Sequence, residues 1–326
     1  MSKRLLYAAL TLALSIGLSA TGAMAEKQRL LLGTSTVGGS YYMLGGTWAK
    51  IINDKLPEYD ISVEVGAGPV ATIPLVQNKE MDMAYVTAWT SGEMFYGKLD
   101  KNPKEYNAQR AFLPLYASYV YLYTLKDSGI KSIHDYAGKP VSTGSAGSSS
   151  FLAGRVINKA LGLNSKLSGM PTGQQLNTLR DGQTKAAYAV SGVPAPFLME
   201  LEATHEVEMI SLSDADLDML LKAQPFWSRG VIPAGTYKCN KDKDISAISL
   251  WNFAVANKDL PEDMIYKITK ASFESLPQLA AAVKTMGDLK PQDILNSSIP
   301  LHPGAVRYYR EKGVDIPDKL LPPEMK

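Results

Sequence analysis

The sequence is poor in cysteine and histidine, which argues against disulfide-stapled and metal-binding proteins. Cys239 is the only cysteine, so no internal disulfide can form. His134, His205 and His302 are the only histidines and lie far apart. Together with a single thiol they give no metal-ligand spacing. We therefore expect no metal and no cofactor, and we interpret Cys239, in a polar stretch, as an incidental thiol.

The sequence also lacks an excess of positive charge. It has 34 Lys and Arg and 32 Asp and Glu, and its first 25 residues contain Lys3 and Arg4 but no acid. The rest of the chain therefore has 32 basic and 32 acidic residues. Nucleic-acid binding needs clustered positive charge, so we expect no nucleic-acid partner.

Long hydrophobic runs are absent after the N-terminus. Leu5–Leu18 follows Lys3 and Arg4 and precedes the small-x-small site Ala23-Met24-Ala25. The run is shorter than the roughly 20 residues that span a bilayer. The pattern predicts a secretory signal peptide at 1–25, cleaved to leave an exported chain. The alternative is a membrane anchor. A lipoprotein is excluded because it needs a cysteine directly after the cleavage site, where this chain has Glu26.

The remaining chain alternates strand-like and helix-like segments in two similar halves. The patterns predict strands at 29–35, 61–65, 83–87, 139–143 and 185–191, and helices at 40–55, 73–78, 150–161 and 261–276. A further short helix is predicted after His302–Gly304, ending at Arg310. Asp259 is the predicted N-cap of the helix at 261–276. This order predicts parallel sheets covered by helices. The expected fold class is therefore α/β, with two α/β lobes.

Two long extended segments, 111–125 and 245–257, are rich in aromatic and aliphatic residues. We predict that they cross between the lobes as a two-strand hinge. The first lobe would then comprise 26–118 and 250–326, and the second 119–249. The alternative is that both segments are ordinary core strands.

Two Gly/Ser loops, Gly33–Ser40 and Gly144–Ser149, each join a predicted strand to a helix N-terminus. Free backbone N–H groups, hydroxyl groups and the positive end of the helix dipole attract anions there. Ligands of open α/β sheets lie beyond the carboxyl ends of the strands, where such loops are found. Each loop alone is also compatible with an ordinary helix cap. The occurrence of two equivalent loops favours an anion site between the lobes.

Aromatic residues lie near the first loop, and we expect one of Tyr41 and Tyr42 to face a ligand and the other to pack. In the second half, Gly192 and Pro194 occupy the position equivalent to Thr87–Trp89. The candidate ligand-binding residues are therefore Thr36, Gly38, Gly39, Ser40, Tyr41, Tyr42, Gly68, Thr87, Trp89, Ser145, Ser148, Ser149, Gly192 and Pro194.

Motifs of catalysis are missing from the sequence. The loop at 33–40 resembles a P-loop but lacks its lysine. No Gly-x-Gly-x-x-Gly follows a strand, and no Gly-x-Ser-x-Gly occurs. Ser145 or Ser148 paired with His134 or His205 is an alternative nucleophile arrangement, but nothing in the sequence brings these residues together. We expect no catalytic residue and no enzyme activity.

The chain resembles the TAXI group of solute receptors that serve TRAP (tripartite ATP-independent periplasmic) transporters. The residues that carry the resemblance are Gly38–Tyr42, Leu44–Gly46, Asp127–Ser132, Gly138–Ser142, Gly144–Ser149, Ile232–Tyr237, Asp259–Asp263 and Ile299–Ala305. The resemblance implies a type II periplasmic binding protein fold and a periplasmic location. It implies an integral membrane permease as partner, driven by an ion gradient rather than ATP. It also implies a small organic acid ligand, a dicarboxylate or a glutamate-like amino acid.

The sequence departs from this family where a ligand amine would need a partner. After Gly68 the family commonly has Ser and an acidic residue, but here Pro69–Ala71 follows. Thr87–Trp89 replaces a Gln-Ser-Asp-like run, and Ser149–Phe151 replaces Gly-Thr-Glu. A buried ammonium group without a carboxylate is costly. We therefore hypothesise an amine-free ligand, a dicarboxylate or a 2-oxo acid such as 2-oxoglutarate.

The expected mechanism is hinge closure of a monomeric receptor over its ligand. Arg155 and Arg229 are outside candidates for binding a carboxylate. The alternatives are a receptor for an ATP-driven importer, a sensory protein that signals to a membrane kinase, and an enzyme.

Overall fold

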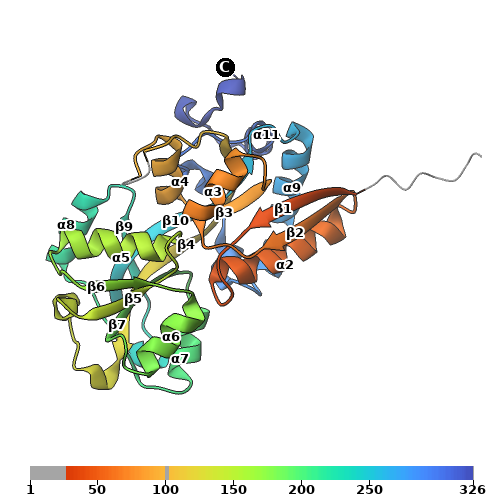
Figure 1. Ribbon diagram of the computed structural model, residues 1–326. Helices are drawn as coiled ribbons and strands as arrows, with labels where there is room; N and C mark the ends of the chain where they lie inside the picture. The colour runs from red at the N-terminus through yellow and green to blue at the C-terminus, as the bar shows by residue number, and fades with distance from the viewer. Residues whose placement is uncertain (1–26, 100–102, 326) are drawn as a thin grey trace, which may run out of the picture.

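The computed structural model describes residues 27–99 and 103–325 (Figure 1). The predicted signal peptide lies outside these residues. Figure 1 shows two α/β lobes, one formed by both ends of the described chain and the other by its middle. In the described part of the chain, no helix is long and apolar enough to cross a membrane.

A mixed sheet runs through both lobes in the strand order β2-β1-β3-β10-β4-β7-β5-β6, with β8 and β9 pairing to β4 and β10. The strands are β1 (Gln28–Gly33), β2 (Tyr59–Glu64), β3 (Met83–Thr87), β4 (Gln109–Leu125), β5 (Pro140–Thr143), β6 (Lys166–Gly169), β7 (Ala186–Ser191), β8 (Val207–Met209), β9 (Ser228–Ile232) and β10 (Ile245–Asn257).

The first lobe is built on β1, which pairs in parallel with β2 and β3. Its helices are α2 (Ser40–Lys55), α3 (Pro69–Gln77), α4 (Ala88–Phe95), α9 (Glu262–Glu274), α10 (Leu276–Leu279) and α11 (Pro303–Glu311). Helix α2 forms because Leu44, Trp48 and Ile52 recur at helical spacing and are buried together. Buried strands and helices of this kind position the loops that follow β1 and β3.

The second lobe repeats this arrangement around β5, which pairs in parallel with β6 and β7. Its helices are α5 (Ser149–Ala160), α6 (Thr172–Arg180), α7 (Pro196–Glu202) and α8 (Asp214–Ala223). Tyr121 and Phe197 contact each other edge to face in its core, with ring centroids 5.5 Å apart.

The two long strands β4 and β10 change partners along their length. The first part of β4 pairs with β10, and Tyr119–Tyr123 pairs with β7. Residues 245–249 of β10 pair with β9, and residues 252–256 pair with β3. Both strands therefore pass from one lobe to the other, and each pairs with all of its neighbouring strands in the antiparallel direction.

Most predicted elements are confirmed with small changes of boundary, because their hydrophobic patterns match what is buried. The helix at 40–55 and the strands at 83–87 and 245–257 have the predicted bounds. The predicted N-cap Asp259 is wrong, because Pro261 is the N-cap of α9. Asp259 instead forms ion pairs with Lys79 and Lys258.

Candidate functional site

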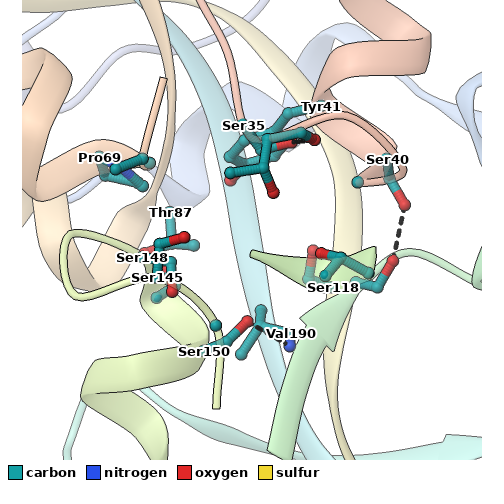
Figure 2. A pocket seen from close by; sticks show the side chains of 18 of the residues that line it. Ser35, Ser40, Tyr41, Pro69, Thr87, Ser118, Ser145, Ser148, Ser150 and Val190 are labelled. Carbon is teal, nitrogen blue, oxygen red and sulfur yellow. Dashed lines mark hydrogen bonds between the residues drawn. The ribbon is translucent and has the colours of Figure 1, made fainter. Parts of the chain in front are cut away.

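A cavity of about 570 Å³, counted with its open mouth, lies between the two lobes at the carboxyl ends of β1, β3, β5 and β7. Its lining is Ser35, Thr36, Gly39, Ser40, Tyr41, Ala67, Gly68, Pro69, Thr87, Tyr116, Ser118, Gly144, Ser145, Ser148, Ser149, Ser150, Thr172, Val190 and Ser191. Figure 2 shows side chains from both lobes surrounding this common space.

Hydroxyl groups dominate the lining, since thirteen of its nineteen residues are Ser, Thr or Tyr. None of the nineteen is Asp, Glu, Lys, Arg or His. Any charge on a ligand would therefore be met by neutral donors rather than by a side chain of opposite charge. Such a site suits an anion that accepts several hydrogen bonds, and it offers no carboxylate to an ammonium group.

Five helices begin at the cavity. Its lining contains the N-cap or first residue of α2, α3, α4, α5 and α6. Each helix N-terminus carries a partial positive charge and N–H groups without a partner inside the helix. Because these helices come from both lobes, their positive ends meet around one space and favour an anion there.

The first Gly/Ser loop leaves its helix start free of side-chain acceptors. Gly39 is the N-cap of α2 and makes no side-chain cap. Its N–H donates to the carbonyl of Thr36 at 3.1 Å, which closes the loop onto the helix. Gly38, at φ 86°, supplies the left-handed backbone of this turn but does not line the cavity.

The second loop is capped by a side chain. Ser148 is the N-cap of α5, and its hydroxyl accepts a hydrogen bond from the N–H of Phe151 at 3.1 Å. That hydroxyl proton remains available for an acceptor in the cavity. The next residue, Ser149, has a buried hydroxyl group with no hydrogen-bond partner among the described residues. A ligand oxygen would supply the missing partner.

Two tyrosines form the floor of the cavity. Tyr41 is buried, and its hydroxyl donates to the side-chain oxygen of Asn252 at 2.5 Å. Tyr116 is also buried, and its hydroxyl forms no hydrogen bond with the described residues. Burial raises the pKa of both hydroxyls well above the usual value for tyrosine. Both therefore stay neutral and act as hydrogen-bond donors or acceptors.

The lobes contact each other directly at the rim of the cavity. The hydroxyl groups of Ser40 in the first lobe and Ser191 in the second are 2.7 Å apart. Figure 2 labels Ser40 and draws this contact as a dashed line. The N–H of Val70 donates to the carbonyl of Gly147 at 3.1 Å. Gly68 has φ 106°, and a Cβ there would lie 2.9 Å from the Cα of Ser148. This approach of α3 to the second loop therefore requires glycine.

The structure brings nine of the fourteen predicted ligand-binding residues into the lining. They are Thr36, Gly39, Ser40, Tyr41, Gly68, Thr87, Ser145, Ser148 and Ser149. Gly38, Tyr42, Trp89, Gly192 and Pro194 are not part of it.

Trp89 was expected near the ligand because it follows β3, but it is only 1% exposed. Its ring contacts Trp227 edge to face, with centroids 5.0 Å apart. The backbone turns into α4 at Thr87, so the indole side chain is directed to the contact between the lobes. Gly192 lies directly behind the lining, where its N–H donates to the hydroxyl of Ser40 at 3.4 Å.

Sequence reasoning missed several lining residues, among them Tyr116, Ser118, Thr172 and Ser191. Tyr116 and Ser118 lie within the long strand β4, where nothing local distinguishes them from core residues. Thr172 begins α6, of which the sequence pattern indicates only the end, at 177–182. The start of that helix, at a threonine following Pro171, is the signal that could have identified Thr172.

The remaining candidates lie away from the cavity. Arg229 pairs with Asp214 and Asp218 at the surface, and Arg155 lines a different groove. His134 pairs with Asp216 at 2.9 Å. Neither His134 nor His205 lines the cavity with Ser145 or Ser148, so the structure does not assemble the alternative nucleophile pair. Among the described residues, no cluster of His, Cys, Asp and Glu could hold a metal.

Comparison with solved structures shows similarity to periplasmic binding proteins. MatC from Rhodopseudomonas palustris, solved with bound malate, is 15% identical over 87% of this chain and 96% of that chain, with a TM-score of 0.55. A structure described as a periplasmic transporter is 14% identical over 89% and 93%, with a TM-score of 0.56. A third structure, from a study of glutathione import through GshT and TcyBC of Streptococcus mutans, is 13% identical over 80% and 95%, with a TM-score of 0.51.

These similarities show the fold, the mixed α/β fold of type II periplasmic solute-binding proteins. Each of the three descriptions concerns binding or transport rather than catalysis. The model of the NMT1-like family matches residues 32–313, which is most of the chain. The chain therefore belongs to the NMT1-like family.

Proposed function

We propose that this protein is a periplasmic solute-binding protein that captures an amine-free organic acid between its lobes without chemically changing it. The observation that carries the proposal is the cavity itself, where five helix N-termini and thirteen hydroxyl-bearing residues meet without one charged side chain. A doubly charged acid with many acceptor oxygens fits these donors. MatC, which shares the fold, was solved with bound malate.

The absence of an acidic residue from the lining argues against an amino acid. An ammonium group buried here would meet only hydroxyl and carbonyl oxygens, which leaves much of its desolvation uncompensated. A hydroxyl or keto group at the same position would accept or donate hydrogen bonds with Ser and Thr. Dicarboxylates and 2-oxo acids, including 2-oxoglutarate, are therefore the proposed ligands, and glutamate is disfavoured.

Delivery to a TRAP-type permease in the periplasm is the proposed role, and it rests on the resemblance to TAXI receptors. We place the lobe boundaries at 26–118 with 250–326 and at 119–249. The change of partners supports this division, because β4 begins to pair with β7 at Tyr119 and β10 begins to pair with β3 at Asn252. The protein would bind as a monomer, by closing about these two strands.

The test is isothermal titration of the chain from residue 26 to 326, unfolded and refolded first so that copurified ligand is removed. Two matched pairs isolate the amine: malate against aspartate, and 2-oxoglutarate against glutamate. We expect the amine-free member of a pair to bind at least about tenfold more tightly, since one uncompensated polar contact costs about 1–3 kcal/mol. Tighter binding of the amino acid would overturn the amine-free ligand, and no binding of any acid would overturn the ligand class.

A matched pair of variants tests whether binding occurs in this cavity. Ser149 and Ser142 both have buried hydroxyl groups without a hydrogen-bond partner in the described part of the chain, but only Ser149 lines the cavity. We expect Ser149→Ala to weaken binding of malate about tenfold or more, as for the loss of a hydrogen bond to a charged group. Ser142→Ala should leave the affinity unchanged. Equal effects of the two variants would place the ligand elsewhere.

A further inference from the structure

Asn252 occupies the place where the cavity meets both crossing strands. It lies in β10, is fully buried and does not line the cavity. On one side its backbone register partner is Thr87 at the end of β3, which does line the cavity. On the other side, pairing with β4 is irregular, because the register shifts between Trp251 and Phe253.

The side chain of Asn252 forms hydrogen bonds at the point where the pairing of β10 with β4 is irregular. Its amide nitrogen donates to the carbonyl of Tyr116 at 2.5 Å and to the hydroxyl of Ser118 at 2.8 Å. Its oxygen accepts from the hydroxyl of Tyr41 at 2.5 Å. The amide thus satisfies a buried backbone carbonyl that the strand ladder skips. All three partners line the cavity.

These contacts lie where the two crossing strands pass from one lobe to the other. Tyr41 belongs to α2, and Tyr116 and Ser118 lie on β4 at the boundary of the first lobe, directly before β4 begins to pair with β7 of the second lobe at Tyr119. Asn252 itself begins the part of β10 that pairs with β3. A single amide therefore connects the cavity floor to both strands where they pass between lobes.

We propose that Asn252 is a positioning residue that holds Tyr41 and Tyr116 against the two crossing strands and thereby sets the angle between the lobes. A ligand that contacts Tyr41 or Tyr116 acts on the hinge through this amide. The inference rests on the proposed function as a hinged binding protein. The inference extends that proposed function by assigning the coupling between cavity and hinge to one residue.

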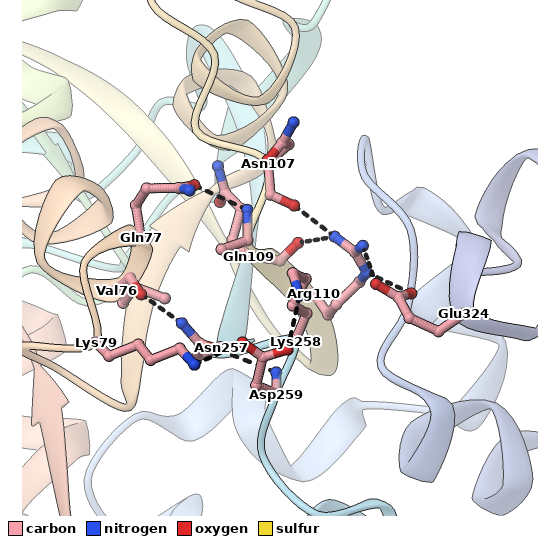
Figure 3. A network of polar contacts seen from close by, with 11 residues as sticks. Val76, Gln77, Lys79, Asn107, Gln109, Arg110, Asn257, Lys258, Asp259 and Glu324 are labelled. Atoms are coloured by element: carbon pink, nitrogen blue, oxygen red, sulfur yellow. Dashed lines mark hydrogen bonds and ion pairs between the residues drawn. The ribbon is translucent and has the colours of Figure 1, made fainter.

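A purely structural role for Asn252 is the competing explanation, and Asn257 provides the matched control. Asn257 is the same residue type in the same strand and is also buried. Its side chain donates to the carbonyl of Val76 and accepts from the N–H of Asp259 (Figure 3), at the end of β10 that is farthest from the change of strand partners. Asn252→Leu and Asn257→Leu each leave buried polar partners unsatisfied, so both should lower the unfolding midpoint.

The deciding measurement is the distance between the lobes, by pulsed dipolar EPR in a Cys239→Ser background. Nitroxide labels go on exposed positions of each lobe, Lys50→Cys in α2 and Met199→Cys in α7. Without ligand, we expect Asn252→Leu to shift and broaden the distance distribution and Asn257→Leu to reproduce the wild type. A wild-type distribution for Asn252→Leu, or equal broadening in both variants, would overturn the proposal.

A second pair of variants tests the same proposal if Asn252→Leu fails to fold. Tyr41→Phe removes only the hydroxyl that bonds to Asn252, whereas Tyr85→Phe removes a buried hydroxyl without a partner among the described residues. Only Tyr41→Phe should change the distance distribution. Malate is then added to the wild type: absence of any response counts against the proposed ligand class, while the ligand-free comparison still decides the role of Asn252.

Discussion

At the scale of single residues, Ser40 shows how one hydroxyl group can serve both lobes. It is the first residue of α2, so its backbone belongs to the positive end of that helix. Its hydroxyl also contacts the hydroxyl of Ser191 and accepts from the N–H of Gly192 in the other lobe. Neutral groups of this kind keep their hydrogen-bonding capacity at all physiological pH values. We therefore expect ligand affinity to vary with pH only through the ligand's own ionisation.

The stability of the fold, unlike ligand binding, depends on a titratable group in the core. His302 is 1% exposed, and its Nδ1 accepts from the N–H of Gly304 as the N-cap of α11. Burial lowers the pKa of His302 to about 4, with the nearby charge of Arg110 acting in the same direction. The unfolded chain therefore binds a proton at a higher pH than the folded chain does. The resulting stability is complete above about pH 6.5 and is lost as the pH falls toward 4.

We expect the free energy of unfolding to fall by about 2 kcal/mol between pH 7.5 and pH 5 through this group. Urea unfolding at the two pH values measures the difference. His302→Asn keeps an N-cap acceptor but removes the titration, so its loss over the same range should be clearly smaller. An equal loss in the variant and the wild type would show that other groups cause the acid sensitivity.

At the scale of elements, helix N-termini are the repeated unit of the site. Each lobe contributes them because each strand-loop-helix connection ends at the same edge of its sheet. A side-chain cap such as Ser148 stabilises its helix and offers a hydroxyl proton to the cavity as well. The two contributions can be separated, because other caps of the same kind lie outside the cavity.

Ser148→Ala should cost about 1 kcal/mol of folding stability and weaken malate binding about tenfold, as expected for a hydrogen bond to a charged group. Ser213 is the matched control, since it caps α8 by accepting from the N–H of Asp216 and does not line the cavity. Ser213→Ala should show a similar loss of stability with unchanged affinity. Thermal unfolding and calorimetric titration give the two quantities. If both variants weakened binding equally, the loss of affinity would be a consequence of stability alone.

At the scale of the whole molecule, binding depends on how closely the lobes approach. Gly147 of the second loop faces α3, and a Cβ on it would lie 3.1 Å from the Cβ of Ala71. The same contact includes the hydrogen bond from Val70 to the carbonyl of Gly147. A larger side chain at this position would separate the lobes without disturbing the core of either one.

We expect Gly147→Val to weaken malate binding about tenfold, because overpacking costs about 1–3 kcal/mol, and to leave the unfolding midpoint of the ligand-free protein nearly unchanged. Gly46→Val is the control, since a Cβ on Gly46 meets nothing within 4 Å. Small-angle scattering in malate should show a larger radius of gyration for Gly147→Val than for the control. Unchanged affinity and size would mean that this contact does not limit closure.

The sequence alone determined the features that depend on short-range pattern. Helix Ser40–Lys55 and strand Met83–Thr87 were predicted with their bounds, because burial of one face imposes a period that the residues display. The two Gly/Ser loops were predicted at helix starts for the same local reason. The lobe boundaries and the identity of the ligand remain predictions.

Only the tertiary structure decided which of these residues meet. Tyr116, Ser118 and Ser191 join the lining because two long strands pair with different partners along their length, and local sequence does not specify such pairing. Trp89 packs against Trp227, a residue far away in the sequence. Local sequence patterns indicate which face of a helix or strand is buried. Which other element packs against that face depends on contacts between distant segments, and these form only in the folded chain.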